Sequence, residues 1–192
     1  MPRPREFEEL TALDDAMQVF WKRGFENTSM DELVKATGVH RGSIYSTFGD
    51  KQALFLKTLD RYLNVEQSQL AATLQAAPLK LPAIRSILLH IANDSTRKNS
   101  RGCFMVNSIV ERAPRDPETQ ARARDCLTHL SKLFEATLAQ AQQTEELRKD
   151  LDVGASAVFL VNTIQGMRVL GKAGVLRPQL LASVEVAMKI FE

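Results

Sequence analysis

Residues 28–54 carry the side chains of this chain that are best suited to contact DNA. A short segment there holds small and hydrogen-bonding residues where an ordinary surface helix would carry Glu and Lys. The guanidinium of Arg41 can pair with O6 and N7 of guanine, whereas hydroxyl groups and the ammonium of Lys51 can bind phosphates. We therefore expect DNA contacts from nine residues: Thr28, Lys35, His40, Arg41, Gly42, Ser43, Tyr45, Ser46 and Lys51.

Two short helices must position these side chains. Ser29 and Glu32 form a Ser-x-x-Glu capping box, which predicts that a helix begins at Ser29. Gly38 ends that helix, because glycine tolerates the left-handed conformation of a tight turn. A second helix is expected from about His40 to Phe48. Two short helices joined at a glycine turn are typical of a helix-turn-helix, whose second helix enters the major groove.

At these positions the chain resembles the TetR family of bacterial transcriptional repressors. The resemblance covers the first quarter of the chain and implies a dimer that binds DNA, with a variable second domain that binds an effector. His40 stands where the family usually has Ser or Thr, and Thr47 where it often has Tyr or His. The matching residues are Phe20, Gly24, Phe25, Thr28, Ser29, Gly38, Val39, Gly42, Ser43, Ile44, Tyr45, Phe48, Lys51 and Leu54.

Composition and periodicity predict an all-α fold. The chain has 192 residues, few aromatic residues and no alternating apolar segments, and it is long enough for a small domain and a larger one. We expect a three-helix helix-turn-helix DNA-binding domain at residues 1–50, then a larger helical ligand-binding and dimerisation domain at 51–192. About nine helices are predicted; those outside the helix-turn-helix pair cover about 5–22, 51–77, 82–96, 102–112, 117–143, 153–172 and 178–192.

Net charge argues against a generic nucleic-acid binder. The whole chain carries a formal charge of +2, and residues 1–60 contain 8 Lys and Arg against 10 Asp and Glu, a net charge of −2. We therefore expect reliance on a specific operator. The alternative class is a dimeric helical ligand-binding or protein-interaction module that has lost DNA binding. A module that no longer binds DNA should have lost side chains such as Arg41, Tyr45 and Lys51, so their presence favours a functional DNA-binding domain.

Several other classes find no support in the sequence. It holds no phosphate-binding loop, nucleophile elbow or zinc-protease motif, so we expect no catalytic residue and no cofactor. His90 and His129 lack partners at ligand spacing, so no metal site is expected. The polar N-terminus, two cysteines and an apolar run limited to residues 153–167 indicate a cytoplasmic protein.

The helix predicted at residues 153–172 is apolar nearly all round, and the final helix adds another apolar face. Two such helices from each chain can form a four-helix bundle between subunits. A core helix of a monomer is the alternative. The residues expected at the dimer interface are Leu160, Ile164, Met167, Leu181, Val184 and Met188.

The resemblance, rather than the pattern, implies a ligand pocket in the larger domain. Polar residues on otherwise apolar helices are its candidates: Asn107, Glu111, Asn162 and Gln165. Each can equally be a satisfied core group or a dimer contact. Cys103 is the fifth candidate, because it lies near a helix start and near cations that stabilise a thiolate. The alternative is that Cys103 acts as a small buried hydrophobe.

Overall fold

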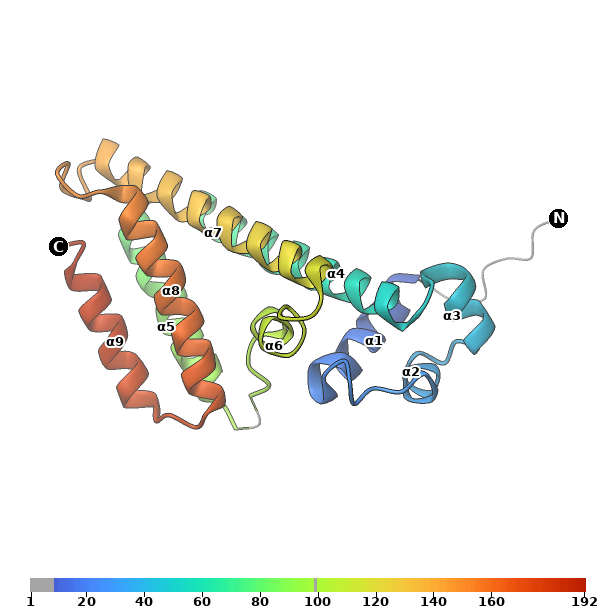
Figure 1. The fold of residues 1–192 in the computed structure, drawn as a ribbon. Coiled ribbons are helices and arrows are strands. Elements are labelled where there is room, and N and C mark those ends of the chain that lie inside the picture. The colour runs from blue at the N-terminus through green and yellow to red at the C-terminus, as the bar shows by residue number, and fades with distance from the viewer. Residues whose placement is uncertain (1–8, 99) are drawn as a thin grey trace. The chain divides into compact units, whose positions relative to one another are not determined.

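The computed structural model describes residues 9–98 and 100–192, and these residues form nine helices and no strand (Figure 1). The all-α prediction is confirmed. The chain divides into two compact units. The first comprises Met1–Val65 and Asn107–Ala123, and the second comprises Glu66–Val106 and Arg124–Glu192. The predicted boundary after residue 50 falls inside the first unit, because the beginning of the fourth helix packs with the helix-turn-helix.

The first unit contains the predicted helix-turn-helix. Its helices are α1 (Glu9–Arg23), α2 (Met30–Thr37) and α3 (Arg41–Phe48), with the beginning of α4 (Lys51–Ala76), the end of α6 (Phe104–Glu111) and the beginning of α7 (Pro117–Gln143). α2 packs against both α1 and α3. The predicted start of the first helix, near Arg5, lies outside the described residues.

The capping signals of α2 form as the sequence predicted. The hydroxyl of Ser29 accepts a hydrogen bond from the backbone N–H of Glu32 at 3.2 Å, and the carboxylate of Glu32 accepts from the N–H of Ser29 at 2.9 Å. Gly38 follows the helix with φ +66°, in the left-handed region that glycine adopts at low cost. Both ends of α2 are therefore fixed by local chemistry.

Three phenylalanine rings form the centre of the first unit. Phe55 packs edge-to-face against Phe20 at 5.3 Å and against Phe25 at 5.2 Å between ring centroids. Trp21 is half-buried and packs edge-to-face against Tyr62 at 5.1 Å between ring centroids. These contacts hold α1 and the turn after it against α4.

The second unit has its own apolar core. α5 (Lys80–Ser95) packs against α8 (Val153–Lys172) and α9 (Arg177–Lys189), and α8 also packs against α9. Asp152 caps α8, because its carboxylate accepts a hydrogen bond from the N–H of Ala155 at 3.0 Å. Of the described helices, α8 alone has the length and composition to cross a membrane. The helix ends at Lys172, five residues after the apolar run predicted to end at Met167.

The residues predicted to form the dimer interface lie in this core instead. Leu160 and Val184 are fully buried within the chain, and Leu181 is half-buried against them. Ile164, Met167 and Met188 are also buried. The residues chosen from the sequence therefore pack α8 and α9 against their own unit. A helix that is apolar all round has two apolar faces, and the sequence does not show which of them is buried in the core.

Candidate nucleic-acid interface

α3 is anchored by its inner face and exposes the rest. Ile44 and Phe48, four residues apart, are 1% and 4% exposed, which fixes the helix against the first unit. Val39 is also buried, in the turn between α2 and α3. The exposed residues of α3 and its N-cap include five of the predicted DNA contacts: His40, Arg41, Gly42, Tyr45 and Ser46.

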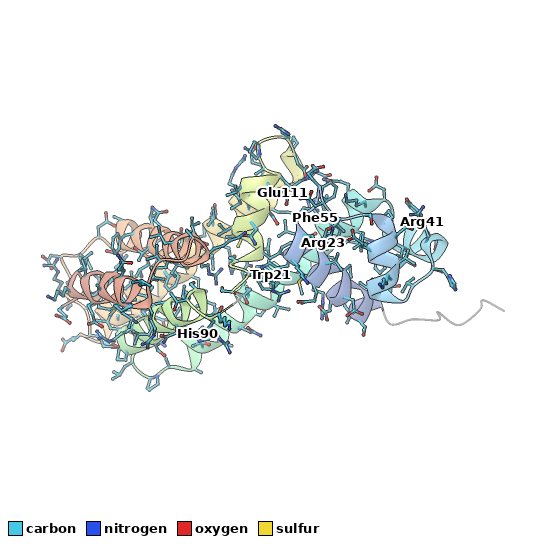
Figure 2. All side chains as sticks on the ribbon, turned by 90° about the horizontal axis from the view of Figure 1, so that it is seen from below. Trp21, Arg23, Arg41, Phe55, His90 and Glu111 are labelled. Carbon is cyan, nitrogen blue, oxygen red and sulfur yellow. The ribbon has the colours of Figure 1, made fainter. Side chains whose placement is uncertain are left out.

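Arg41 is held by an ion pair on this surface. Its Nη2 lies 2.8 Å from Oδ1 of Asp31 on α2, and the two side chains are 52% and 89% exposed. Figure 2 labels Arg41. An ion pair this exposed contributes at most about 1 kcal/mol. The guanidinium is therefore oriented at the surface but can exchange its carboxylate partner for another acceptor at small cost.

The other predicted contacts surround α3 in different environments. Ser46 donates a hydrogen bond to the carbonyl of Ser43 at 3.1 Å, and Ser43 is half-buried. Lys35 is exposed in the last turn of α2. Lys51 is half-buried, and its Nζ lies 4.3 Å from the centre of the Phe25 ring. The ammonium predicted to bind phosphate thus rests on an aromatic face in this DNA-free structure.

Thr28 differs from its prediction. Its side chain is 1% exposed, and its hydroxyl donates a hydrogen bond to the carbonyl of Gly24 at 2.6 Å. The hydroxyl expected to hold a phosphate therefore stabilises the turn before α2. A residue pattern alone does not show whether this hydroxyl faces solvent or the Gly24 carbonyl four residues earlier.

The second unit brings Cys103 together with residues that the sequence analysis did not select. The buried Cys103 Sγ accepts a hydrogen bond from Nη1 of Arg168 on α8 at 2.9 Å. Nη2 of the same arginine lies 3.3 Å from Oε2 of Glu66. Arg168 lies one turn from Gln165 on the same side of α8. The two amide heteroatoms of Gln165 are buried and have no hydrogen-bond partner in the described part of the chain.

The remaining ligand candidates are not gathered at this place. Asn162 is exposed on α8, and Asn107 is half-buried in the first unit. Glu111 also belongs to the first unit, where its carboxylate binds backbone amides. A prediction from polar residues on apolar helices could not separate these cases, because helical spacing does not reveal which distant element lies opposite. The structure brings Cys103 and Gln165 close to one arginine and distributes the other three elsewhere.

Cys126, the second cysteine, has a different character. It is buried on α7, and burial raises the pKa of its thiol, with only partial compensation by a hydrogen bond to Gln67. The thiolate is the nucleophilic form, so a raised pKa lowers the reactivity of Cys126. Among the described residues, no group of three His, Cys, Asp or Glu side chains is arranged to hold a metal ion.

The second unit also leaves apolar side chains exposed on α8 and α9. They project from faces opposite the core stripe, at helical spacing, and their exposed fractions run from 36% to 64%. The exposed residues are Val158, Phe159, Val169 and Leu170 on α8, Val186 on α9 and Ile190 at the C-cap of α9. Apolar faces of this kind on two neighbouring helices mark an interaction surface.

Comparison with known protein families agrees with both units. Residues 12–58 match the family model "Bacterial regulatory proteins, tetR family", and residues 80–176 match "Tetracyclin repressor-like, C-terminal domain". The chain is similar to the transcriptional repressor ComR of Escherichia coli, with 32% identity over 98% of this chain and 87% of that protein. It is also similar to the uncharacterised regulator YezE of Bacillus subtilis, with 28% identity over the full length of both.

The fold is similar to that of a solved protein–DNA complex. A cysteine mutant of the TetR family regulator CifR, bound to 26-base-pair operator DNA, superposes with a TM-score of 0.86. The two proteins are 29% identical, and the match covers 99% of this chain and 100% of that one. The structure of reduced NemR from Escherichia coli has a TM-score of 0.85 at 19% identity and supports the fold alone.

Proposed function

Because the chain belongs to the TetR family, it is a DNA-binding transcriptional regulator, and we propose that it represses from a near-palindromic operator until an effector releases it. The family is one of regulators rather than of enzymes, so we propose no catalytic activity. A regulator of genes acts where the DNA is, so we propose a cytoplasmic location. The observation that carries the proposal is the exposed surface of α3, with Arg41 oriented and its backbone open at Gly42.

DNA recognition assigns a role to each exposed group of α3. Arg41 leaves Asp31 and pairs with a guanine in the major groove. Gly42 allows the helix backbone to approach the DNA, because among the described residues nothing lies within 4 Å of a Cβ built there. Tyr45, which is 46% exposed, and Lys51 bind phosphates and fix the register.

The homodimer forms through the exposed apolar faces of α8 and α9. CifR, a regulator similar to this chain, is solved on double-stranded operator DNA. Two copies of a helix-turn-helix reach successive major grooves when their recognition helices lie about 34–36 Å apart or slightly more. Pairing the two exposed faces with those of a second chain makes a four-helix bundle and removes Phe159 and Val186 from water.

The effector acts at Cys103 and Arg168 in the second unit, as a thiol-reactive compound or as a small molecule that binds there. The Cys103 sulfur, which accepts a hydrogen bond from Arg168, is the nucleophile that an electrophile would modify. The buried amide of Gln165 offers a donor and an acceptor to a ligand. N-Ethylmaleimide should release DNA from the wild type and leave the Cys103→Ser variant bound. Equal responses would point to non-covalent binding.

A gel shift with the DNA upstream of the protein's own gene tests the central proposal. Wild-type protein should shift this DNA at a concentration that leaves unrelated DNA of the same length unshifted. Arg41→Ala should weaken operator binding by about 1–3 kcal/mol and relax selection at one base position, whereas Lys51→Ala should weaken all sequences alike. If Arg41→Ala bound the operator as tightly as the wild type, the assignment of α3 would be wrong.

A further inference from the structure

The end of α6 holds the turn between α1 and α2 from outside the helix-turn-helix. Glu111 is the last residue of α6, and its Oε2 accepts a hydrogen bond from the backbone N–H of Phe25 at 3.0 Å. Its Oε1 accepts from the N–H of Glu26 at 2.9 Å. One carboxylate thus binds two successive amides 85 and 86 residues away in the chain, and hydrogen bonds to a charged acceptor are the strong class.

Gly24 shows how closely the carboxylate approaches this turn. A Cβ at Gly24 would lie 2.7 Å from both carboxylate oxygens of Glu111, closer than real Cβ contacts allow. Gly24 also has φ +81°, which other residues rarely adopt. The turn therefore has the backbone shape and the free space that the carboxylate requires.

The next residue, Arg112, connects the same turn to the beginning of α4. Its Nη1 lies 2.8 Å from Oε1 of Glu26, and its Nη2 donates to Oε1 of Gln52 on α4 at 2.6 Å. Its guanidinium carbon lies 4.0 Å from the centre of the Phe25 ring, which is a favourable cation–π contact. Only 15% of the Arg112 side chain is exposed, whereas its partner Glu26 is 65% exposed, so the arginine is the shielded member of this pair.

The turn held by Glu111 leads directly into α2. The Thr28 hydroxyl bonds to the carbonyl of Gly24, and Ser29 then caps α2, which packs against α3. The position of the turn thus sets where α2 begins and how α3 is presented. Figure 2 labels Glu111 and Arg41, the two ends of this series of contacts within the first unit.

We propose that Glu111 is a positioning residue for DNA binding: it holds the Gly24–Glu26 turn in the conformation from which α3 reads the operator. The proposal rests on the proposed function.

Glu111→Gln tests this role with little change of shape, because it removes the charge and one of the two acceptor oxygens. Glu118→Gln is the matched control: it removes the same charge from an exposed side chain at the start of α7. The probe is a duplex selected from random-sequence DNA by the wild-type protein. Glu111→Gln should bind it about tenfold more weakly if a tenth of the molecules keep the turn in place. Glu118→Gln should bind as the wild type does.

Two further readouts separate positioning from direct contact and from unfolding. The slope of log affinity against log salt should stay at the wild-type value in Glu111→Gln, because Glu111 touches no phosphate, whereas Lys51→Ala should lower it by about one. Hydrogen exchange of the Phe25 and Glu26 amides should be slow in the wild type and faster in Glu111→Gln. The wild-type exchange measurement stands even if the variant does not fold.

Equal affinity of Glu111→Gln and wild type would overturn the role of Glu111 and leave the proposed function intact. Wild-type amides of Phe25 and Glu26 that exchange as fast as unbonded amides would overturn it as well. Failure of the wild-type protein to select any DNA would instead overturn the proposed function.

Discussion

Gly42→Ala should make the protein more stable and a weaker DNA binder at the same time. Gly42 is the second residue of α3, and among the described residues nothing lies within 4 Å of the added methyl carbon. Alanine in a helix is favoured over glycine by up to about 1 kcal/mol, and we expect about 0.5 kcal/mol this near the helix start. For a chain of this length that raises the melting temperature by about 1–2 °C.

The same methyl group should keep the α3 backbone away from the DNA. Losing the close approach, and with it well-aligned neighbouring contacts, should weaken operator binding at least about tenfold, or 1.4 kcal/mol. Fluorescence anisotropy of a labelled operator measures the affinity, and thermal unfolding followed by circular dichroism measures the stability. The variant and the wild type must be compared at one protein concentration, because dimerisation makes the melting temperature concentration-dependent.

Gly38→Ala is the matched comparison. In the described structure nothing lies within 4 Å of a Cβ at Gly38 either, so the two substitutions differ in backbone conformation rather than in space. Gly38 has φ +66°, and alanine there should cost about 1 kcal/mol and lower the melting temperature by about 2–4 °C. If Gly42→Ala left operator affinity unchanged, the placement of α3 against DNA would be refuted. If it lowered the stability, the open helical position of Gly42 would be refuted instead.

Asp31→Asn should tighten operator binding several-fold at low salt and less at high salt, because it frees Arg41 and removes a negative charge beside the DNA; unchanged affinity would show that the ion pair does not compete. Val186→Glu should produce monomers in sedimentation at micromolar concentration, while Val110→Glu, also on an exposed valine but in the first unit's α6, should leave the dimer intact. Burial alone would raise the pKa of Asp116, but hydrogen bonds from Thr119, Gln52 and backbone amides outweigh it and lower this pKa to about 2. The ordinary pKa of this group is 3.8, so its contribution to stability is complete above pH 3.8 and is lost as the pH falls towards 2. Asp116→Asn should therefore flatten the pH dependence of the free energy of unfolding over that window.

Local signals let the sequence predict the helices closely. Ser29, Asp152 and Pro117 mark helix starts that the structure confirms, because a cap or an N-terminal proline acts within a few residues of its own position. The same locality explains the predicted end of α2 at Gly38. About nine helices were expected and the described residues form nine.

Local signals do not predict contacts between segments that are distant in the sequence. The periodicity of α8 identifies two apolar stripes but not which one faces the core, so Leu160 was chosen for the interface although Phe159 and Val158 are the exposed residues. The carboxylate of Glu111 binds the amides of Phe25 and Glu26, which lie 86 and 85 positions away, and no spacing rule predicts such contacts. Arg168 was missed for the same reason, since only the fold brings it to Cys103.

The anchoring of α3 by two side chains has a consequence for engineering. Ile44 and Phe48 alone on this helix are buried, so the residues that hold it in place and the residues that face outward form two nearly separate sets. A library randomised at the outward positions should fold throughout and differ only in the DNA that each member selects. Transplanting the eight-residue helix alone into another scaffold should fail, because an isolated helix this short does not persist in water. New operator preferences are therefore best obtained by exchanging the exposed side chains of α3 within the intact protein.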